Sequence, residues 1–104
     1  MIQVSVMYPN QDDARFDMAY YTEIHIPLIR KLTGDACRRV SVQRGLGGPQ
    51  PHSKPTYVAL GHLYFDSVPA FEQAFGPHAQ QIMADLSNFT NLNPTIQINE
   101  VVVE

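Results

Sequence analysis

The pattern of hydrophobic and polar residues predicts four strands and two helical regions. In residues 2–8 every second residue is strongly apolar, which is typical of a strand with one buried face. Related patterns predict further strands over residues 40–46, 56–65 and 95–103. Residues 47–55 hold three prolines and two glycines, so we expect a loop there.

The predicted strand at residues 56–65 has no polar side. One of its faces carries Ala59, Leu63 and Phe65, and the other carries Leu60 and Tyr64. Because a strand alternates its side chains between two faces, both faces of this strand need cover. The predicted helices are enough to cover only one face, so we expect a second subunit to cover the other.

Two segments have helical spacing. The first begins at Asp17, a suitable N-cap, and ends near Gly34. Pro27 lies inside this helix and lacks an N–H group, so we expect a kink there. The second begins at Ser67, is interrupted at Gly76-Pro77 and continues over residues 78–86.

The resulting order of elements is β-α-β-β-α-β over one domain, residues 1–104. This order predicts an α+β, ferredoxin-like fold, in which both helices cover one face of an antiparallel four-stranded sheet. The uncovered face would be apolar, and apolar faces of this size mark interfaces. We therefore predict a homodimer through the open sheet face, forming a dimeric α/β barrel with a chamber for a small hydrophobic ligand.

Composition narrows the function classes. The chain has 104 residues, 44% of them hydrophobic, and a net charge of −3 without a basic run, which argues against nucleic-acid binding. No apolar run approaches the roughly 20 residues of a membrane span, and the first residues do not resemble a signal peptide. Cys37 is the only cysteine, so we expect a reducing, cytoplasmic location.

His25 is the strongest candidate for chemistry. It lies toward the apolar side of the first helix, and Tyr21 precedes it by one helical turn. An imidazole beside a phenol in a half-buried place can exchange protons near neutral pH. The alternative is a core histidine that binds a backbone carbonyl freed by the kink. A shift of one residue in the helix start would exchange Tyr20 and Tyr21, so the sequence leaves open which of them faces inward.

Two other histidines and one arginine are candidate ligand-binding residues. His78 follows Pro77 at a helix restart, where it could donate to a ligand or lie exposed. His62 on the central strand could line the chamber or pack under a helix. Arg44 alternates with apolar residues and needs a partner there, either a substrate anion or a structural carboxylate such as that of Asp85.

Asp85 and Phe89 lie around the end of the second helical region and complete the candidate set. Phe89 could form a wall of the chamber or plug the core. The spacing of His, Cys and carboxylate residues matches no metal-binding pattern, and the glycines at residues 45–48 lack the register of a nucleotide loop. We therefore expect neither a metal nor another cofactor.

The chain resembles the EthD family, named for ethyl tert-butyl ether degradation. The most specific part of the resemblance is the helix signature with Tyr20, Tyr21, His25, Pro27 and Leu28. The later runs 62–67, 71–78 and 82–91 also match. The resemblance implies the dimeric α/β-barrel superfamily and places His25 toward the chamber, with Tyr21, His78 and Asp85 at further family positions. It implies no particular reaction, because a fold hosts many functions.

Three functions remain open at this point. The first is a cofactor-independent enzyme that moves protons on a small hydrophobic carbonyl, lactone or aromatic compound, with His25 and Tyr21 as catalytic residues. The second is a non-catalytic carrier of a hydrophobic metabolite. The third is a structural dimer module whose chamber is filled by its own side chains.

Overall fold

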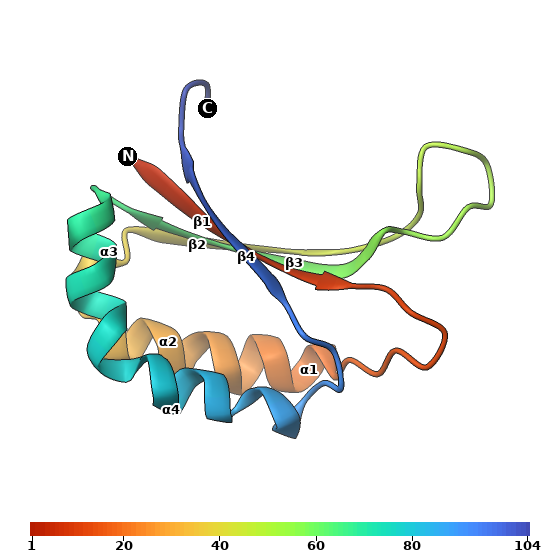
Figure 1. The fold of residues 1–104 in the computed structure, drawn as a ribbon, viewed down its shortest axis with the longest axis horizontal. Coiled ribbons are helices and arrows are strands. Elements are labelled where there is room, and N and C mark those ends of the chain that lie inside the picture. Colours follow the sequence, from red (N-terminus) through yellow and green to blue (C-terminus); the bar gives the residue numbers. More distant parts are fainter.

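The computed structural model describes residues 1–104 as a four-stranded sheet with helices on one face (Figure 1). The strands are β1 (Ile2–Pro9), β2 (Arg39–Arg44), β3 (Tyr57–Phe65) and β4 (Thr95–Glu100). They lie in the order β2-β3-β1-β4, and all neighbouring pairs are antiparallel. With the helices between them, this is the predicted α+β, ferredoxin-like arrangement.

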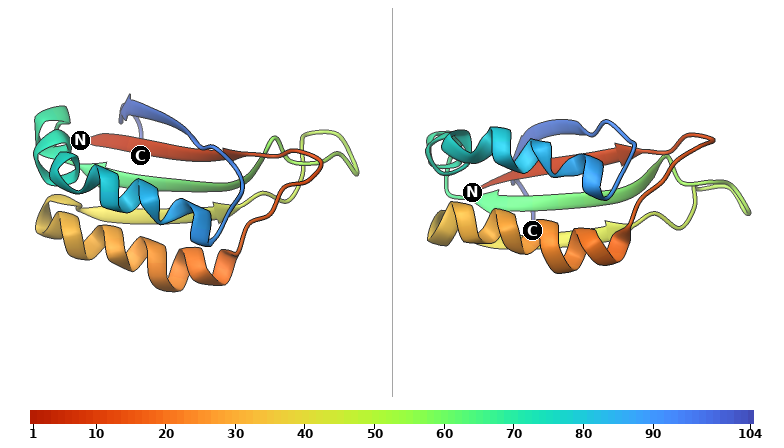
Figure 2. Two further views of the ribbon diagram at one scale, coloured as in Figure 1. Left: turned by 60° about the horizontal axis from the view of Figure 1, so that its bottom comes forward. Right: turned by 90° about the horizontal axis from the view of Figure 1, so that it is seen from below.

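The helices follow one another in two continuous helical segments along that face, which we call the two helical lines. The first runs from α1 (Met18–Tyr20) through a π-helical turn (Tyr21–His25) into α2 (Ile26–Thr33). The second consists of α3 (Val68–Phe75) and α4 (Ala79–Ala84), joined by a short 3₁₀ turn at Gly76–His78. Figure 2 shows both lines on the same side of the sheet, with α4 beside the first helix. None of these helices combines the length and the apolar composition that crossing a bilayer requires.

Local capping explains where the helices begin and end. The Asp17 side chain accepts a hydrogen bond from the Tyr20 N–H at 3.1 Å, and the Ser67 side chain accepts one from the Ala70 N–H at 3.2 Å. The first helix ends at Gly34, whose φ of +62° and ψ of −146° suit only glycine. These termini confirm the predictions made at Asp17, Gly34 and Ser67.

The expected kink at Pro27 takes the form of a wider helical turn. The Ile26 N–H bonds to the Tyr21 carbonyl, five residues earlier rather than the usual four. Pro27 follows immediately and has no N–H to offer, so the regular ladder cannot continue through this position. Single π-helical turns of this kind occur often at functional sites, and here the turn ends at His25.

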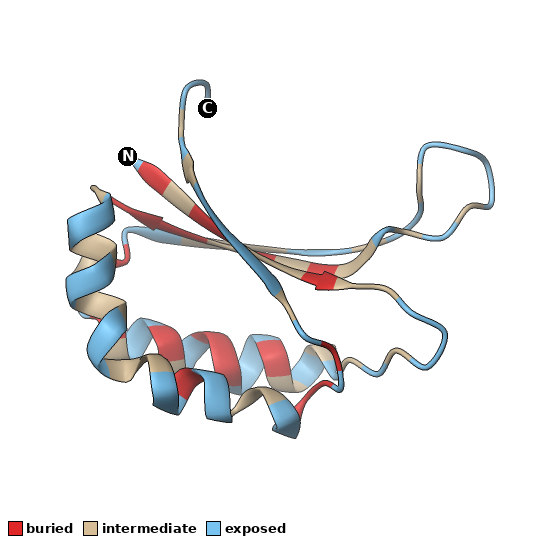
Figure 3. Ribbon diagram, in the orientation of Figure 1, coloured by how far each residue is buried: buried red, intermediate tan, exposed pale blue.

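The core lies between the sheet and the helices (Figure 3). Val4 and Tyr8 of β1, and Ala59, Leu63 and Phe65 of β3, have at most 2% of their surface exposed. These residues face the helices because they occupy alternate positions of two directly paired strands. One side of the strand at 56–65 is therefore covered as predicted.

The open face of the sheet is more polar than its central strand suggested. Ser5 Oγ lies 2.9 Å from His62 Nδ1, the Gln3 amide donates to the Tyr64 hydroxyl at 2.8 Å, and the Asn99 amide donates to Ser5 Oγ at 2.9 Å. The register explains this, because β1, β2 and β4 place mostly polar side chains beside those of β3 on this face. Apolar side chains remain at its other end, where Met7 pairs with Leu60.

The last strand is shorter than the predicted range 95–103. It ends at Glu100, which pairs with Ile2 at the start of β1. Beyond this point β1 offers no further partner residues, and only the Val101 N–H still bonds, to the Met1 carbonyl. The apolar residues that follow therefore lack a neighbouring strand, and Val102 and Val103 are exposed.

Candidate active site

The π-helical turn positions two aromatic side chains toward the sheet. Tyr21 and His25 are each only 2% exposed, and their rings stack with centroids 5.7 Å apart and planes 19° apart. This answers the question that the sequence left open, because Tyr21 is the inward tyrosine. Phe89 lies against His25 with centroids 4.6 Å apart and is fully buried, so the imidazole packs against two aromatic rings that also contact each other.

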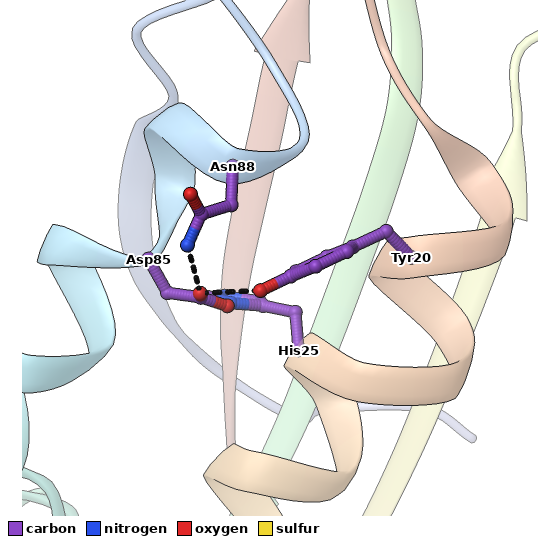
Figure 4. A network of polar contacts seen from close by, with 4 residues as sticks. All are labelled: Tyr20, His25, Asp85 and Asn88. Atoms are coloured by element: carbon purple, nitrogen blue, oxygen red, sulfur yellow. Dashed lines mark hydrogen bonds and ion pairs between the residues drawn. The ribbon is translucent and has the colours of Figure 1, made fainter.

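Asp85 follows α4 directly and meets His25 across the two helical lines (Figure 4). Its Oδ2 lies 2.9 Å from His25 Nδ1. Its Oδ1 accepts hydrogen bonds from the Tyr20 hydroxyl at 2.7 Å and from the Asn88 amide at 2.8 Å. Three donors therefore fix the carboxylate, and the carboxylate in turn fixes the imidazole.

This network determines the tautomer of His25. A carboxylate can only accept hydrogen bonds, so Nδ1 carries the proton and the neutral ring has its lone pair on Nε2. Nε2 makes no hydrogen bond within the chain, and no buried side-chain nitrogen or oxygen is left without a partner. It follows that Nε2 is not sealed off and keeps access to space outside the protein atoms.

Burial and hydrogen bonding set the charge states. Burial lowers the pKa of His25 below its ordinary value of 6.5, although the hydrogen bond to Asp85 and its charge act in the opposite direction. Burial also acts to raise the pKa of Asp85, but the hydrogen bonds from His25, Asn88 and Tyr20 outweigh it and lower that pKa. Near neutral pH the pair therefore consists of a neutral imidazole and a carboxylate.

A narrow cleft lies beside this pair, between the sheet and the two helical lines. Its cavity volume is about 30 Å³, and the space around it that is free of protein atoms, open solvent at the mouth included, is about 410 Å³. Its walls are mainly apolar and include Ile26, Ile29, Leu63 and Ile82, and His25 is the only titratable residue of its lining apart from two tyrosines. The apolar walls favour a hydrophobic compound, for which the two helical segments beside the cleft would have to move apart.

Gly61 of β3 also lines the cleft, directly under Tyr21. A Cβ atom built on Gly61 would overlap the Tyr21 hydroxyl oxygen, while the Cζ atom of the same ring would be 3.5 Å away. The central strand therefore needs a glycine at this point so that the Tyr21 hydroxyl can approach its backbone closely.

The other predicted site residues lie elsewhere. His62 is on the open face of the sheet, where it contacts Ser5. His78 is half-buried at the start of α4 and does not line the cleft. Arg44 is the last residue of the edge strand β2 and is exposed. It makes no ion pair with Asp85, whose oxygens are taken by His25, Tyr20 and Asn88.

Three residues of the site were not among the predicted ones. Tyr20 and Asn88 bind Asp85, and Tyr8 of β1 lines the cleft beside Tyr21. Asn88 follows Asp85 by three residues, a spacing that could have indicated their contact. Tyr8 occupies an apolar-face position of its strand, so its hydroxyl had to be accommodated in the core or in a cavity.

Known proteins resemble this chain in sequence and in structure. A sequence model of the EthD domain matches residues 9–93. An uncharacterised 11.0 kDa protein from the thcB–thcC intergenic region of Rhodococcus erythropolis is 32% identical over 96 residues, which cover 88% of this chain and 85% of that protein. The match to the EthD domain agrees with the resemblance found in the tyrosine–histidine–proline helix.

Two solved structures extend the comparison. An EthD-like protein from Ralstonia eutropha JMP134 superposes with a TM-score of 0.95 and 41% sequence identity. The superposition covers 99% of this chain and 93% of the Ralstonia chain. An ethyl tert-butyl ether (EthD) family protein from Bacillus halodurans C-125 superposes with a TM-score of 0.73 at 22% sequence identity. The superposition covers 98% of this chain and 99% of the Bacillus chain. The second likeness concerns the fold alone.

Proposed function

The chain belongs to the EthD family, and from that premise we propose that it is a small cofactor-independent enzyme that moves protons on a hydrophobic carbonyl, lactone or aromatic compound. One observation carries this proposal. His25 is tied through Nδ1 to Asp85 at 2.9 Å, while its unpaired Nε2 belongs to a side chain that lines an apolar cleft. A base that is held in one tautomer beside a ligand site is arranged for general acid–base catalysis.

The proposed step is a proton transfer. Nε2 of neutral His25 takes a proton from a carbon next to the carbonyl, and the electrons of that C–H bond move into an enolate. The imidazolium so formed faces the Asp85 carboxylate, which stabilises its positive charge. Return of the proton to a different carbon would isomerise the compound, and return to the same carbon would restore it.

We expect the chain to catalyse the exchange of the methylene protons of 2-indanone, a flat and readily enolised ketone, in deuterated buffer. The base is neutral His25, so the rate should fall as pH falls through the lowered pKa of this residue. Well above its ordinary value of 6.5 the rate should be constant, because the imidazole is then neutral. Proton NMR of the ketone at a series of pH values measures this profile.

Two outcomes of that experiment would contradict the proposal. Exchange no faster than in buffer, with 2-indanone nevertheless bound in the cleft, would favour the carrier, for which the apolar lining is sufficient. Exchange that continues unchanged at a pH where NMR shows His25 to be protonated would show that another group removes the proton.

The homodimer remains a prediction, and we propose that it forms through the open face of the sheet. Sedimentation equilibrium is then expected to give twice the chain mass of 11.7 kDa. Leu60→Lys places a charge on the apolar end of that face and should return the monomer. Ile24→Lys, at a half-exposed position of the first helix, serves as the control and should remain dimeric. A monomeric unsubstituted chain would refute the interface.

A further inference from the structure

The cleft holds two phenol groups whose hydrogen-bonding capacity is not used up by the protein. Tyr8 and Tyr21 both line it, and they are 1% and 2% exposed. Their rings meet edge to face with centroids 5.6 Å apart. Their hydroxyls affect each other's pKa through a mutual hydrogen bond, and no hydrogen bond joins either hydroxyl to a third side chain.

Such a pair leaves at least one donor free. Each phenol has one proton, and when one hydroxyl donates to the other, the second proton still lacks an acceptor. Both phenols line the cleft, so a ligand oxygen there could accept a hydrogen bond from this second proton. Burial raises the pKa of Tyr21 to about 12 and that of Tyr8 further, so both groups are donors at neutral pH.

The charge of the cleft restricts what this oxygen can be. No lysine, arginine, aspartate or glutamate lines the cleft, and the remaining walls are apolar. A carboxylate or phosphate would lose its hydration there without meeting a cation. A neutral carbonyl oxygen needs only hydrogen-bond donors, which the two phenols supply.

We propose that Tyr8 and Tyr21 together bind the carbonyl oxygen of an uncharged, enolisable ketone or lactone. Tyr21 stacks directly on His25, so a carbonyl held by the phenols presents its neighbouring C–H group toward the imidazole. During the proton transfer the oxygen gains negative charge, and the same two donors then stabilise the enolate. The proton transfer from the C–H group to His25 rests on the proposed function. The binding of the carbonyl oxygen by the two phenols does not.

The test compares 2-indanone with indane, a hydrocarbon of the same shape that lacks the oxygen. Dissociation constants from NMR titration are measured for the unsubstituted chain, Tyr8→Phe, Tyr21→Phe and the double variant. We expect each substitution to raise the dissociation constant of 2-indanone about 3- to 10-fold, which is the effect of one neutral hydrogen bond. The dissociation constant of indane should stay nearly unchanged. Tyr64→Phe, on the open face of the sheet, is the matched control and should change neither.

A spectroscopic measurement supports the titration. The infrared carbonyl stretch of bound 2-indanone should lie at lower frequency in the unsubstituted chain than in the double variant, because hydrogen-bond donors weaken the C=O bond. The subsite is refuted if the unsubstituted chain does not prefer 2-indanone to indane. It is equally refuted if that preference and the carbonyl frequency persist in the double variant.

Failure of this inference and failure of the proposed function give different results. A ketone preference that disappears in the phenylalanine variants, without any deuterium exchange by the unsubstituted chain, would support the subsite and refute the base. Exchange that depends on His25, with a preference unaffected by Tyr8→Phe and Tyr21→Phe, would support the base and refute the subsite.

Discussion

His25→Gln is expected to lower the rate of 2-indanone exchange by at least about 100-fold, the usual contribution of a positioned general base. Glutamine fills much of the same volume and can still donate a hydrogen bond to Asp85, but its amide does not accept a proton near neutral pH. The loss should appear in the rate at which bound 2-indanone exchanges its protons, while the dissociation constant of 2-indanone changes little.

Asp85→Asn should produce a comparable loss although it leaves His25 in place. The asparagine amide can donate to Nδ1, which would place the ring proton on Nε2 and remove the lone pair of that nitrogen. The imidazolium would also lose the charge that stabilises it. His25→Gln therefore tests whether the imidazole is needed for exchange, and Asp85→Asn tests whether its tautomer is needed.

His78→Gln is the matched control for these variants. His78 lies outside the cleft, so its substitution should leave exchange within about twofold of the unsubstituted chain. Circular dichroism verifies that all three variants keep the fold. Equal exchange by His25→Gln and the unsubstituted chain would refute the proposed base.

Gly61→Ala is expected to lower the free energy of unfolding by about 1–3 kcal/mol, the range for an overpacked core. The added methyl group would overlap the Tyr21 hydroxyl oxygen. Tyr21 cannot easily turn aside, because Tyr8, Phe16 and Phe89 surround its ring at centroid distances of 5.0–5.6 Å. Denaturant unfolding measures the loss, and the cleft should also bind 2-indanone more weakly.

Removing the phenol oxygen should rescue this variant. In Tyr21→Phe the closest ring atom to the new methyl group would be Cζ, at an ordinary van der Waals distance of 3.5 Å. Gly61→Ala should therefore cost less in the Tyr21→Phe background than alone, a coupling that a double-mutant cycle reveals. Additive effects of the two substitutions would contradict the contact.

Gly76→Ala is the control for the glycine substitution. Gly76 has a helical φ of −52°, and a Cβ there would meet nothing within 4 Å. Alanine should change the free energy of unfolding little, because the gain from restricting the unfolded state is offset by the disfavoured helical backbone before Pro77. A much larger loss at Gly61 than at Gly76 would show that the effect at Gly61 comes from its contact with Tyr21.

Local sequence signals were sufficient for most of the fold. Asp17 and Ser67 cap the helices that they were predicted to cap, and Gly34 ends the first helix. These signals act over a few residues and can be recognised without tertiary structure. The alternation of Ile2 to Tyr8 likewise predicted which face of β1 is buried.

Features that depend on distant partners could not be predicted in the same way. The open face of the sheet is polar because of the register between strands, and β4 ends where β1 begins. Arg44 alternates with apolar residues but lies at the exposed end of an edge strand. No local pattern reports where a neighbouring strand begins or how far a helix reaches.

The candidate site illustrates the same division. His25 and Tyr21 were predicted from helical spacing, because both lie on one helix. Asp85 was a candidate as well, but its contact with His25 joins residues 60 positions apart and was not predicted. The π-helical turn also alters the phase of the helix, so Tyr20 and Tyr21 both contribute, one to the carboxylate and one to the cleft.

Nitrogen NMR of the histidine side chains tests the central claim most directly. Near neutral pH, His25 is expected to carry its proton on Nδ1, to titrate below its ordinary pKa of 6.5, and to shift at Nε2 when 2-indanone is added. His52, in the exposed loop, should not respond to the ketone. The account would be contradicted by a proton on Nε2 of His25, or by an Nε2 chemical shift of His25 that does not change when 2-indanone is added.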